Sequence, residues 1–108
     1  MNLNISERLY AIRILNDFKG GLDVLATVLE DIKPIAITDE EWLKAEREIT
    51  GDGDNTTWKL NDEKGGEKEI SLQKDTLNYL KKTLDKKNDA GEFGLADKAV
   101  ISLRKKLG

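Results

Sequence analysis

The sequence contains no cysteine and no histidine, and its only proline is Pro34. Without cysteine the chain has no disulfide, no thiolate nucleophile and no cysteine-based zinc site. Without histidine it lacks the commonest general base and metal ligand. No apolar run approaches the roughly 20 residues that span a bilayer, and the start of the chain lacks the apolar core of a signal peptide. We therefore expect a soluble cytoplasmic protein that is not an enzyme, has no cofactor and does not bind membranes.

The 108 residues are enough for one compact domain over 1–108. Apolar residues make up 38% and charged residues 36%, which predicts a small core under a heavily charged exterior. Residues 1–54 hold 6 basic and 12 acidic residues, and residues 55–108 hold 12 and 9. Such an asymmetry can orient the molecule on a partner, or it can pair the two halves of one fold.

Apolar residues at spacings of three and four predict five helices. They are expected at about residues 7–15, 22–32, 39–48, 73–87 and 95–107. Ser6 is a plausible N-cap for the first helix, and Pro34 is expected to end the second. Thr38 and Glu41 fit a capping box at the start of the third. The apolar residues of the second helix form one stripe, made of Leu22, Leu25, Val28, Leu29 and Ile32.

Two short stretches between the third and fourth helices alternate apolar and polar residues, which predicts a β-hairpin. The alternating apolar residues are Trp58 and Leu60 in the first stretch and Ile70 and Leu72 in the second. Pairing Trp58 with Ile70 puts both apolar sets on one face and Lys59 opposite Glu69 on the other. The loop is then 63–65, with glycine at its last position. The predicted fold is α+β and mostly helical.

No motif in the sequence indicates catalysis. The acidic residues lie at the ends and polar faces of predicted helices, so we interpret them as solvated. Phosphate-binding loops and nucleophile elbows are absent from the sequence. Asp52, Asp54 and Glu63 match part of a calcium-loop spacing, but Thr57 occupies the place where a glycine is needed. A plain turn between a helix and a strand is the better interpretation.

Three helices followed by a hairpin also suggest a winged-helix protein that binds nucleic acid. In that arrangement the helix before the hairpin enters the major groove. Here that helix has a net charge of −3, which phosphates would repel. The hairpin lysines Lys59, Lys64 and Lys68 could still contact a nucleic-acid backbone, so this class remains an alternative.

Two further groups of residues are candidates for binding a partner. Lys82 and Lys86 share a face of the fourth predicted helix and could meet an acidic surface. Trp42 and Trp58 are the largest side chains and are expected in the core, but an exposed tryptophan would be a good anchor for a partner. The candidate partner-binding residues are Trp42, Trp58, Lys59, Lys64, Lys68, Lys82 and Lys86.

Several local motifs together resemble a group of small phage and prophage proteins. The matching segments are Glu7-Arg8-Leu9, Gly20-Gly21, Thr38-Asp39-Glu40-Glu41, Trp58-Lys59-Leu60 and Glu67-Lys68-Glu69-Ile70, followed by a leucine-rich helix. The sequence departs from that group at 16–19, where those proteins often have a proline. The resemblance implies a phage origin and a bacterial host cytoplasm, and it carries no catalytic residue over to this chain.

Three hypotheses follow. The first is a non-enzymatic phage or prophage protein that occupies a surface on a host or phage macromolecule, for example as an inhibitor of a bacterial defence factor. The second is a nucleic-acid-binding protein that uses its hairpin lysines. The third is a structural subunit of a virion or larger assembly.

Overall fold

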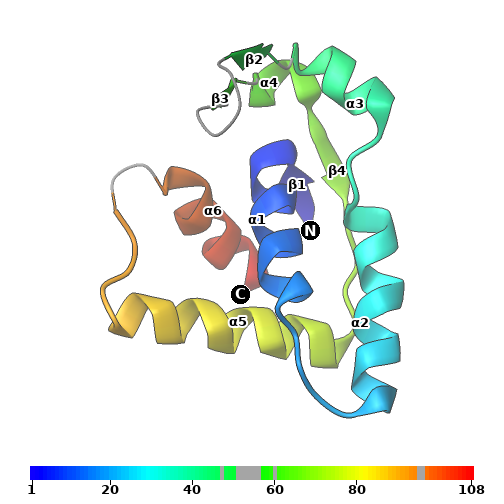
Figure 1. The fold of residues 1–108 in the computed structure, drawn as a ribbon, viewed down its shortest axis with the longest axis vertical. Helices are drawn as coiled ribbons and strands as arrows, with labels where there is room; N and C mark the ends of the chain where they lie inside the picture. The colour runs from blue at the N-terminus through cyan, green and yellow to red at the C-terminus, as the bar shows by residue number, and fades with distance from the viewer. Residues whose placement is uncertain (47, 51–56, 60, 95–96) are drawn as a thin grey trace.

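The computed structural model describes residues 1–46, 48–50, 57–59, 61–94 and 97–108, with the backbone alone at 48–50 and 57–59. These residues form six helices and four short strands (Figure 1). The helices are α1 (Ile5–Asn16), α2 (Leu22–Ile35), α3 (Asp39–Lys44), α4 (Asp62–Gly65), α5 (Lys74–Asp89) and α6 (Lys98–Leu107). The strands are β1 (Asn2–Asn4), β2 (Glu48–Thr50), β3 (Thr57–Lys59) and β4 (Glu67–Glu69). The fold is mostly helical and contains two-stranded antiparallel sheets.

The strands pair differently from the predicted hairpin. β4 pairs with the N-terminal β1, where Leu3 lies opposite Lys68, and β3 pairs with β2, where Ile49 lies opposite Trp58. The predicted pairing of Trp58 with Ile70 is therefore wrong. The amide of Ile70 instead donates to the carbonyl of Met1 over 2.7 Å.

The predicted pairing fails because the segment expected as its loop is the short helix α4. The Asn61 side chain accepts a hydrogen bond from the amide of Lys64 at 3.1 Å, which caps that helix. A helical turn does not return the chain alongside itself as a hairpin loop does. Lys59 consequently lies opposite Glu48, and Glu69 lies opposite Asn2.

Two capping boxes start helices in the N-terminal half. The box of Thr38 and Glu41 is confirmed, with Glu41 N donating to Thr38 Oγ1 and Thr38 N to Glu41 Oε1, both at 3.2 Å. The predicted N-cap at Ser6 is wrong, since Asn4 and Glu7 form an equivalent box with its N-cap two residues earlier. Ser6 instead donates from its hydroxyl to the carboxylate of Asp62 at 2.8 and 2.9 Å.

Three helix ends also differ from the prediction. Helix α2 continues past Pro34 to Ile35. Ile35 is buried in the core, and a side chain from another helix donates hydrogen bonds to the last carbonyl groups of α2, as described below. Helix α3 ends at Lys44 instead of near Glu48, since Glu46 adopts a left-handed φ of 53° that breaks the helix. Helix α6 starts at Lys98, and residues 95–96, where its start was expected, lie outside the described residues.

The core surrounds α1, which runs through the middle of the molecule with α2, α5 and α6 around it (Figure 1). Phe18 and Tyr79 close one end of this core with an edge-to-face ring contact, 4.9 Å between centroids. The core cluster consists of Leu3, Ala11, Ile14, Leu15, Val28, Ile35, Ile70, Leu80, Leu84, Val100, Leu103 and Leu107.

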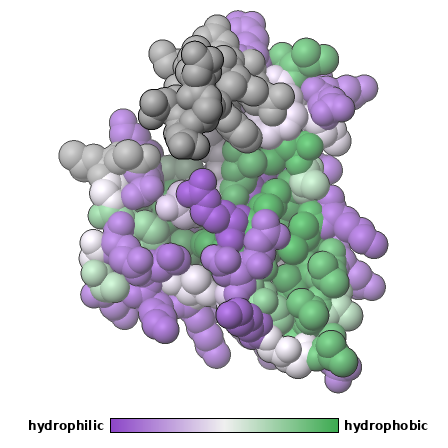
Figure 2. Space-filling model, viewed as in Figure 1, coloured by the Kyte–Doolittle hydropathy of each residue, from purple (hydrophilic) through white to green (hydrophobic). Residues whose placement is uncertain are grey.

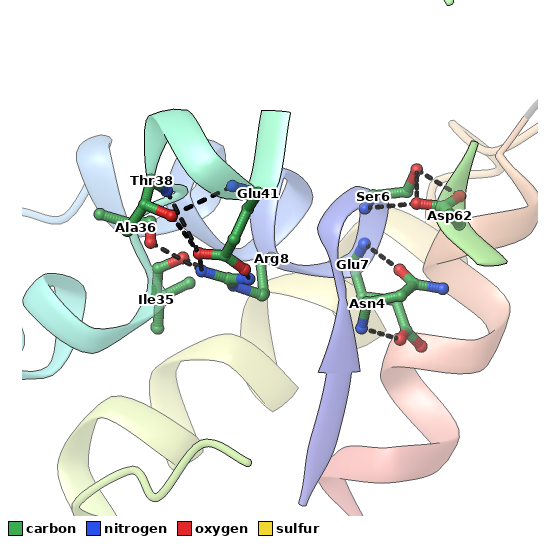
Figure 3. Close-up of polar contacts among 9 residues, drawn as sticks. All are labelled: Asn4, Ser6, Glu7, Arg8, Ile35, Ala36, Thr38, Glu41 and Asp62. Atoms are coloured by element: carbon green, nitrogen blue, oxygen red, sulfur yellow. Dashed lines mark hydrogen bonds and ion pairs between the residues drawn. The ribbon is translucent and has the colours of Figure 1, made fainter. Parts of the chain in front are cut away.

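A buried arginine holds α1, α2 and α3 together (Figure 3). Arg8 is fully buried, and it donates to the carbonyls of Ile35 at 2.9 Å and Ala36 at 2.6 Å. Its Nη1 and Nη2 atoms form a two-pronged pair with the Glu41 carboxylate, so Nη2 donates both to Ala36 and to Glu41. A cation at the carboxyl end of a helix is favourable, so Arg8 stabilises the last turn of α2 although Pro34 donates no hydrogen bond.

A second buried charge joins α1 to α6 and β4. Glu7 is fully buried, and its Oε1 accepts from the ammonium of Lys106 at 2.8 Å and from the amide of Asn4 at 2.9 Å. Lys106 also reaches Glu67 at 3.4 Å. Burial would raise the pKa of Glu7, but the hydrogen bonds from Lys106 and Asn4 and the charge of Lys106 outweigh it and lower the pKa. Glu7 is therefore held as a carboxylate.

Candidate functional site

A groove of about 610 Å³ lies between α5 and α6. Its apolar residues are Leu84, Phe93, Val100 and Ile101, and its polar residues are Asp85, Asn88, Asp97, Arg104 and Lys105, with Gly94 at its edge. The volume falls in the range of about 300–1,000 Å³ that is usual for clefts that bind ligands. We therefore take this groove as the candidate site.

The apolar part of the groove follows from the helical spacing of α5 and α6. Helix α6 buries Val100, Leu103 and Leu107 on one stripe. Ile101 lies about 100° around the helix from Val100, so it cannot share that stripe. It remains 61% exposed along the groove. An exposed isoleucine next to buried apolar residues offers a surface that a partner's apolar side chain can cover.

The connection between the two helices opens the groove at one end. Helix α5 ends at Asp89, and Gly91 adopts a left-handed φ of 68° just beyond its C-cap. Glycine adopts this conformation readily, so the chain turns away from the helix axis here. Phe93 follows this turn, lines the groove and packs against the core cluster.

An ion pair between two charged side chains connects the helices that line the groove. Arg104 donates to both oxygens of Asp85, at 2.9 and 3.2 Å, and to the carbonyl of Gly108 at 2.8 Å. The hydrogen bonds and charge of Arg104 lower the pKa of Asp85. These bonds link α5 to α6 across the groove. The charges of Arg104 and Asp85 therefore neutralise each other.

Two other polar residues of the groove, Asp97 and Lys105, differ in their hydrogen bonds and ion pairs. Asp97 accepts from the amide of Gly94 at 2.9 Å and from the hydroxyl of Tyr10 at 3.3 Å. Burial and the charge of Asp97 raise the pKa of Tyr10. Lys105 is exposed, and no ion pair engages it within the described residues. Lys105 is therefore the cation that a carboxylate entering the groove would meet.

The predicted partner-binding lysines do not converge on one site. Lys82 and Lys86 are exposed on α5, where the groove is lined by Asp85 and Asn88 instead. Lys64 lies on α4 and forms an ion pair with Glu46 at 2.7 Å, and Lys68 is exposed on β4. Helix α4 and strand β4 lie toward the other end of the molecule from α5 (Figure 1).

The two tryptophans give no single anchor surface. Trp42 is half-buried on the short helix α3, so its expected place in the core is only partly realised. The side chains of Trp58 and Lys59 lie outside the described residues, and so do Asp52 and Asp54 of the calcium-like spacing. Glu63 is exposed on α4 and lines a second hollow, of about 490 Å³.

The second hollow is lined by polar residues and one glycine, and two of its three carboxylates already accept hydrogen bonds. It is lined by Asn2, Asn4, Asp62, Glu63, Gly66 and Glu67. Asp62 accepts from Ser6, and Glu67 from Lys106. Across the described part of the chain, no group of three or more acidic, histidine or cysteine side chains is placed to hold a metal ion. This hollow offers a partner less apolar area than the groove does.

The groove residues Phe93, Ile101 and Lys105 were missed by the sequence analysis. One signal was available, because Ala99, Val100, Ile101 and Leu103 place more apolar residues in one turn than a single buried stripe can use. An extra apolar residue beside such a stripe indicates a second contact surface. The position of Phe93 depends on the turn after α5 and has no comparable signal.

No helix in the described ranges has the length and apolar character needed to cross a bilayer. Comparisons of the chain with protein-family models, with curated proteins and with solved structures found no match.

Proposed function

We propose that this protein is a small, non-enzymatic accessory protein of a phage or prophage that acts by binding another protein. The observation that carries the proposal is the α5–α6 groove, where a 61% exposed isoleucine lies beside buried apolar residues under a charged rim. An apolar cleft with a few polar groups is the usual form of a binding site. Interface hot spots cluster in well-packed pockets where the side chains become fully desolvated.

The groove suits a peptide segment with an apolar residue and a neighbouring carboxylate. The apolar side chain would cover Ile101 and Phe93, and the carboxylate would meet the ammonium of Lys105. The rim carboxylates Asp85 and Asp97 already accept hydrogen bonds, so they hold the shape of the groove. These contacts favour binding over bond-making chemistry.

The resemblance to phage proteins supports a setting in the cytoplasm of a bacterial host. The partner is then a host or phage protein, and the more specific form of the proposal is inhibition of a bacterial defence factor. A defence factor bound in the groove could no longer use the same surface to bind its own partner. A protein of this size can act in this way without catalytic residues.

The nucleic-acid alternative has less support. Helix α3 has only six residues, and Asp39, Glu40 and Glu41 fill its first turn. A groove-reading helix would bring these carboxylates to the phosphates, which repel them. Of the lysines suggested for backbone contact, Lys64 is paired with Glu46, and the side chain of Lys59 lies outside the described residues.

Binding to bacterial proteins tests the proposal. The immobilised wild-type protein is compared with Ile101→Asp, which puts a charge in the apolar lining of the groove, and with Leu43→Asp as the matched control. Leu43 is 79% exposed on α3, outside the groove, so both variants should fold like the wild type by circular dichroism.

We expect wild type and Leu43→Asp to retain the same bacterial protein and Ile101→Asp to lose it. The retained protein, once purified, should bind the wild type directly, with at least tenfold weaker binding to Ile101→Asp. If immobilised Ile101→Asp retains the bacterial protein as well as the wild type does, the result would contradict the proposal. Tight, salt-sensitive binding of DNA by the wild type would support the nucleic-acid alternative instead.

A further inference from the structure

Asp97 occupies the N-cap position of α6 but does not cap the helix. An aspartate at this position usually accepts a hydrogen bond from an amide of the first helical turn. Asn4 and Thr38 accept such a bond at the starts of α1 and α3, where the backbone of the N-cap is extended. The backbone of Asp97 has φ −93° and ψ 39°, and its carboxylate makes no capping bond. Both carboxylate oxygens bind elsewhere.

One oxygen of Asp97 holds the chain that connects α5 to α6. Asp97 Oδ2 accepts from the amide of Gly94 at 2.9 Å, and the amide of Asp97 donates to the carbonyl of Gly94 at 3.0 Å. Gly94 directly follows Phe93, the aromatic residue in the lining of the groove. The two bonds therefore keep the chain just after Phe93 close to the start of α6.

The chain before Phe93 is held by α5 instead. The amides of Gly91 and Glu92 donate to carbonyls in the last turn of α5, at 3.0 and 3.1 Å. Among the described residues, no backbone hydrogen bond of this kind reaches beyond Glu92. In this part of the structure, the position of the chain after Phe93 therefore depends on the bonds between Gly94 and Asp97.

The other oxygen of Asp97 is bound by a residue of the central helix. The hydroxyl of Tyr10 on α1 donates to Asp97 Oδ1 at 3.3 Å, across 87 positions of the sequence. Tyr10 is half-buried against the core cluster, and the guanidinium of Arg13 lies 5.5 Å from the centre of its ring. Tyr10 does not line the groove. Since α1 packs against α2, α5 and α6, this contact ties Asp97 to the middle of the fold (Figure 1).

The position of Phe93 matters because the groove offers few apolar side chains to a partner. Hydrophilic residues cover much of α5 on the face that Figure 2 shows. Leu84 and Val100 in the groove are only 1% and 3% exposed. Its accessible apolar surface is therefore mainly that of Ile101 and Phe93, and a displaced Phe93 would remove one of these two contacts.

We propose that Tyr10 is a positioning residue of the α5–α6 groove. Its hydroxyl fixes the carboxylate of Asp97, and that carboxylate fixes the amide of Gly94 and so keeps Phe93 in the wall of the groove. Tyr10 thereby strengthens the binding of a partner that it does not contact. The inference rests on the proposed function, since it names a residue outside the groove on which binding depends.

Amide hydrogen exchange of the purified chain, followed by NMR, tests these contacts without a partner. Tyr10→Phe removes the hydroxyl and keeps the ring. We expect the amide of Gly94 to exchange about threefold faster, as the loss of one hydrogen bond predicts. The amides of Leu80 and Leu103, which are fully buried in the core, should keep their wild-type rates.

Tyr79→Phe is the matched control for the loss of a hydroxyl. Tyr79 is half-buried on α5 and packs against the ring of Phe18, away from the groove lining. This variant should leave the exchange rate of Gly94 unchanged. If Tyr10→Phe also leaves that rate unchanged, or speeds exchange in the core equally, the positioning contact is overturned.

A double variant tests whether Tyr10 acts through Asp97. Asp97→Ala removes the acceptor and should speed the exchange of Gly94 at least tenfold. Because its carboxylate makes no capping bond, this variant should keep the wild-type circular dichroism. Tyr10→Phe added to Asp97→Ala should have no further effect on Gly94. A further threefold rise in the double variant would overturn action through the carboxylate.

Binding gives the second measurement. The bacterial protein that the wild type retains, once purified, should bind Tyr10→Phe about threefold more weakly and Tyr79→Phe with wild-type affinity, as measured by calorimetry. Unchanged binding by Tyr10→Phe despite faster exchange at Gly94 would overturn the role of Tyr10 in affinity. A wild type that retains no protein would contradict the proposed function, whereas the exchange rates would still decide the positioning contact.

Discussion

The guanidinium of Arg8 and the carboxylate of Glu41 form a two-pronged ion pair that joins α1 to α3 across 33 positions of the sequence. Arg8 has no exposed side-chain surface, and Glu41 keeps 19% of its own. The same carboxylate completes the capping box with Thr38. Arg8 also binds the end of α2, so this pair fixes how α2 and α3 follow one another.

Removal of the Glu41 carboxylate should destabilise the fold. Glu41→Ala leaves a buried cation without its partner, and breaking such a pair costs about 3–5 kcal/mol when it is fully buried. Because Glu41 is partly exposed, we expect a loss of about 3 kcal/mol in the free energy of unfolding, measured with urea. The control Glu40→Ala removes an exposed carboxylate from the same turn and should cost about 0.5 kcal/mol or less. Equal losses in the two variants would contradict this role.

The same pair should make stability depend on pH. The hydrogen bonds and charge of Arg8 lower the pKa of Glu41 from 4.5 to about 2. A lowered pKa in the folded state stabilises the fold above the unfolded pKa, and that contribution is lost as pH falls from about 5 to about 2. The difference corresponds to about 3 kcal/mol.

Urea unfolding at several pH values between 7 and 2 measures this effect. Glu41→Gln should lose stability at neutral pH and show a flatter pH dependence than the wild type in the acid range. Some slope should remain, since the pKa values of Glu7 and Asp85 are also lowered in the folded state. Parallel curves for the wild type and Glu41→Gln would show that another group carries the pH dependence.

Lys106 should be needed for stability, because it is the cation that pairs with the buried carboxylate of Glu7. Lys106→Met leaves the fully buried carboxylate without a cation, and we expect a loss of about 3 kcal/mol at pH 7. The double variant Glu7→Gln/Lys106→Met removes both charges and should be more stable than Lys106→Met alone. Lys105→Met changes an exposed lysine in the same helical turn and should stay within about 0.5 kcal/mol of the wild type. A double variant with a lower free energy of unfolding than Lys106→Met would argue against the pairing.

Gly65 should not tolerate a side chain. A Cβ atom at this position would lie 2.6 Å from Ile5 Cδ1 and 3.2 Å from Ala45 Cβ. Both neighbours are fully buried, so Gly65→Ala should cost about 1–3 kcal/mol through overpacking. Gly94→Ala is the control, because nothing lies within 4 Å of its Cβ position. Equal thermal midpoints for the two variants would show that α4 can move away from α1.

The helices could largely be predicted from local patterns. The Thr38 capping box depends on residues three positions apart, and the structure has it as predicted. The Asn4 box and the Asn61 cap are equally local, and the sequence carries both signals. The first was missed because Ser6 offered a competing N-cap, and the second because a glycine after Lys64 also suits a hairpin loop.

The candidate surfaces were less predictable than the helices. The spacing of apolar residues in α2 and α6 was visible, but it could not show which of them the core would bury. Leu29 and Val28 belong to the same predicted stripe, yet only Val28 is buried. That choice depends on where α1 and α5 contact α2.

The sequence by itself determined the helical segments, the capping box at Thr38 and the shortage of groups for catalysis, because each depends on residue type or on neighbours within one turn. Only the tertiary structure decided that β1 pairs with β4, that Arg8 binds Glu41 and that α5 and α6 enclose a groove. The first two contacts join residues far apart in the chain and depend on the closure of long loops, and the groove depends on how two whole helices pack. Residue patterns within one segment indicate which face is apolar, but they do not specify which other segment packs against it.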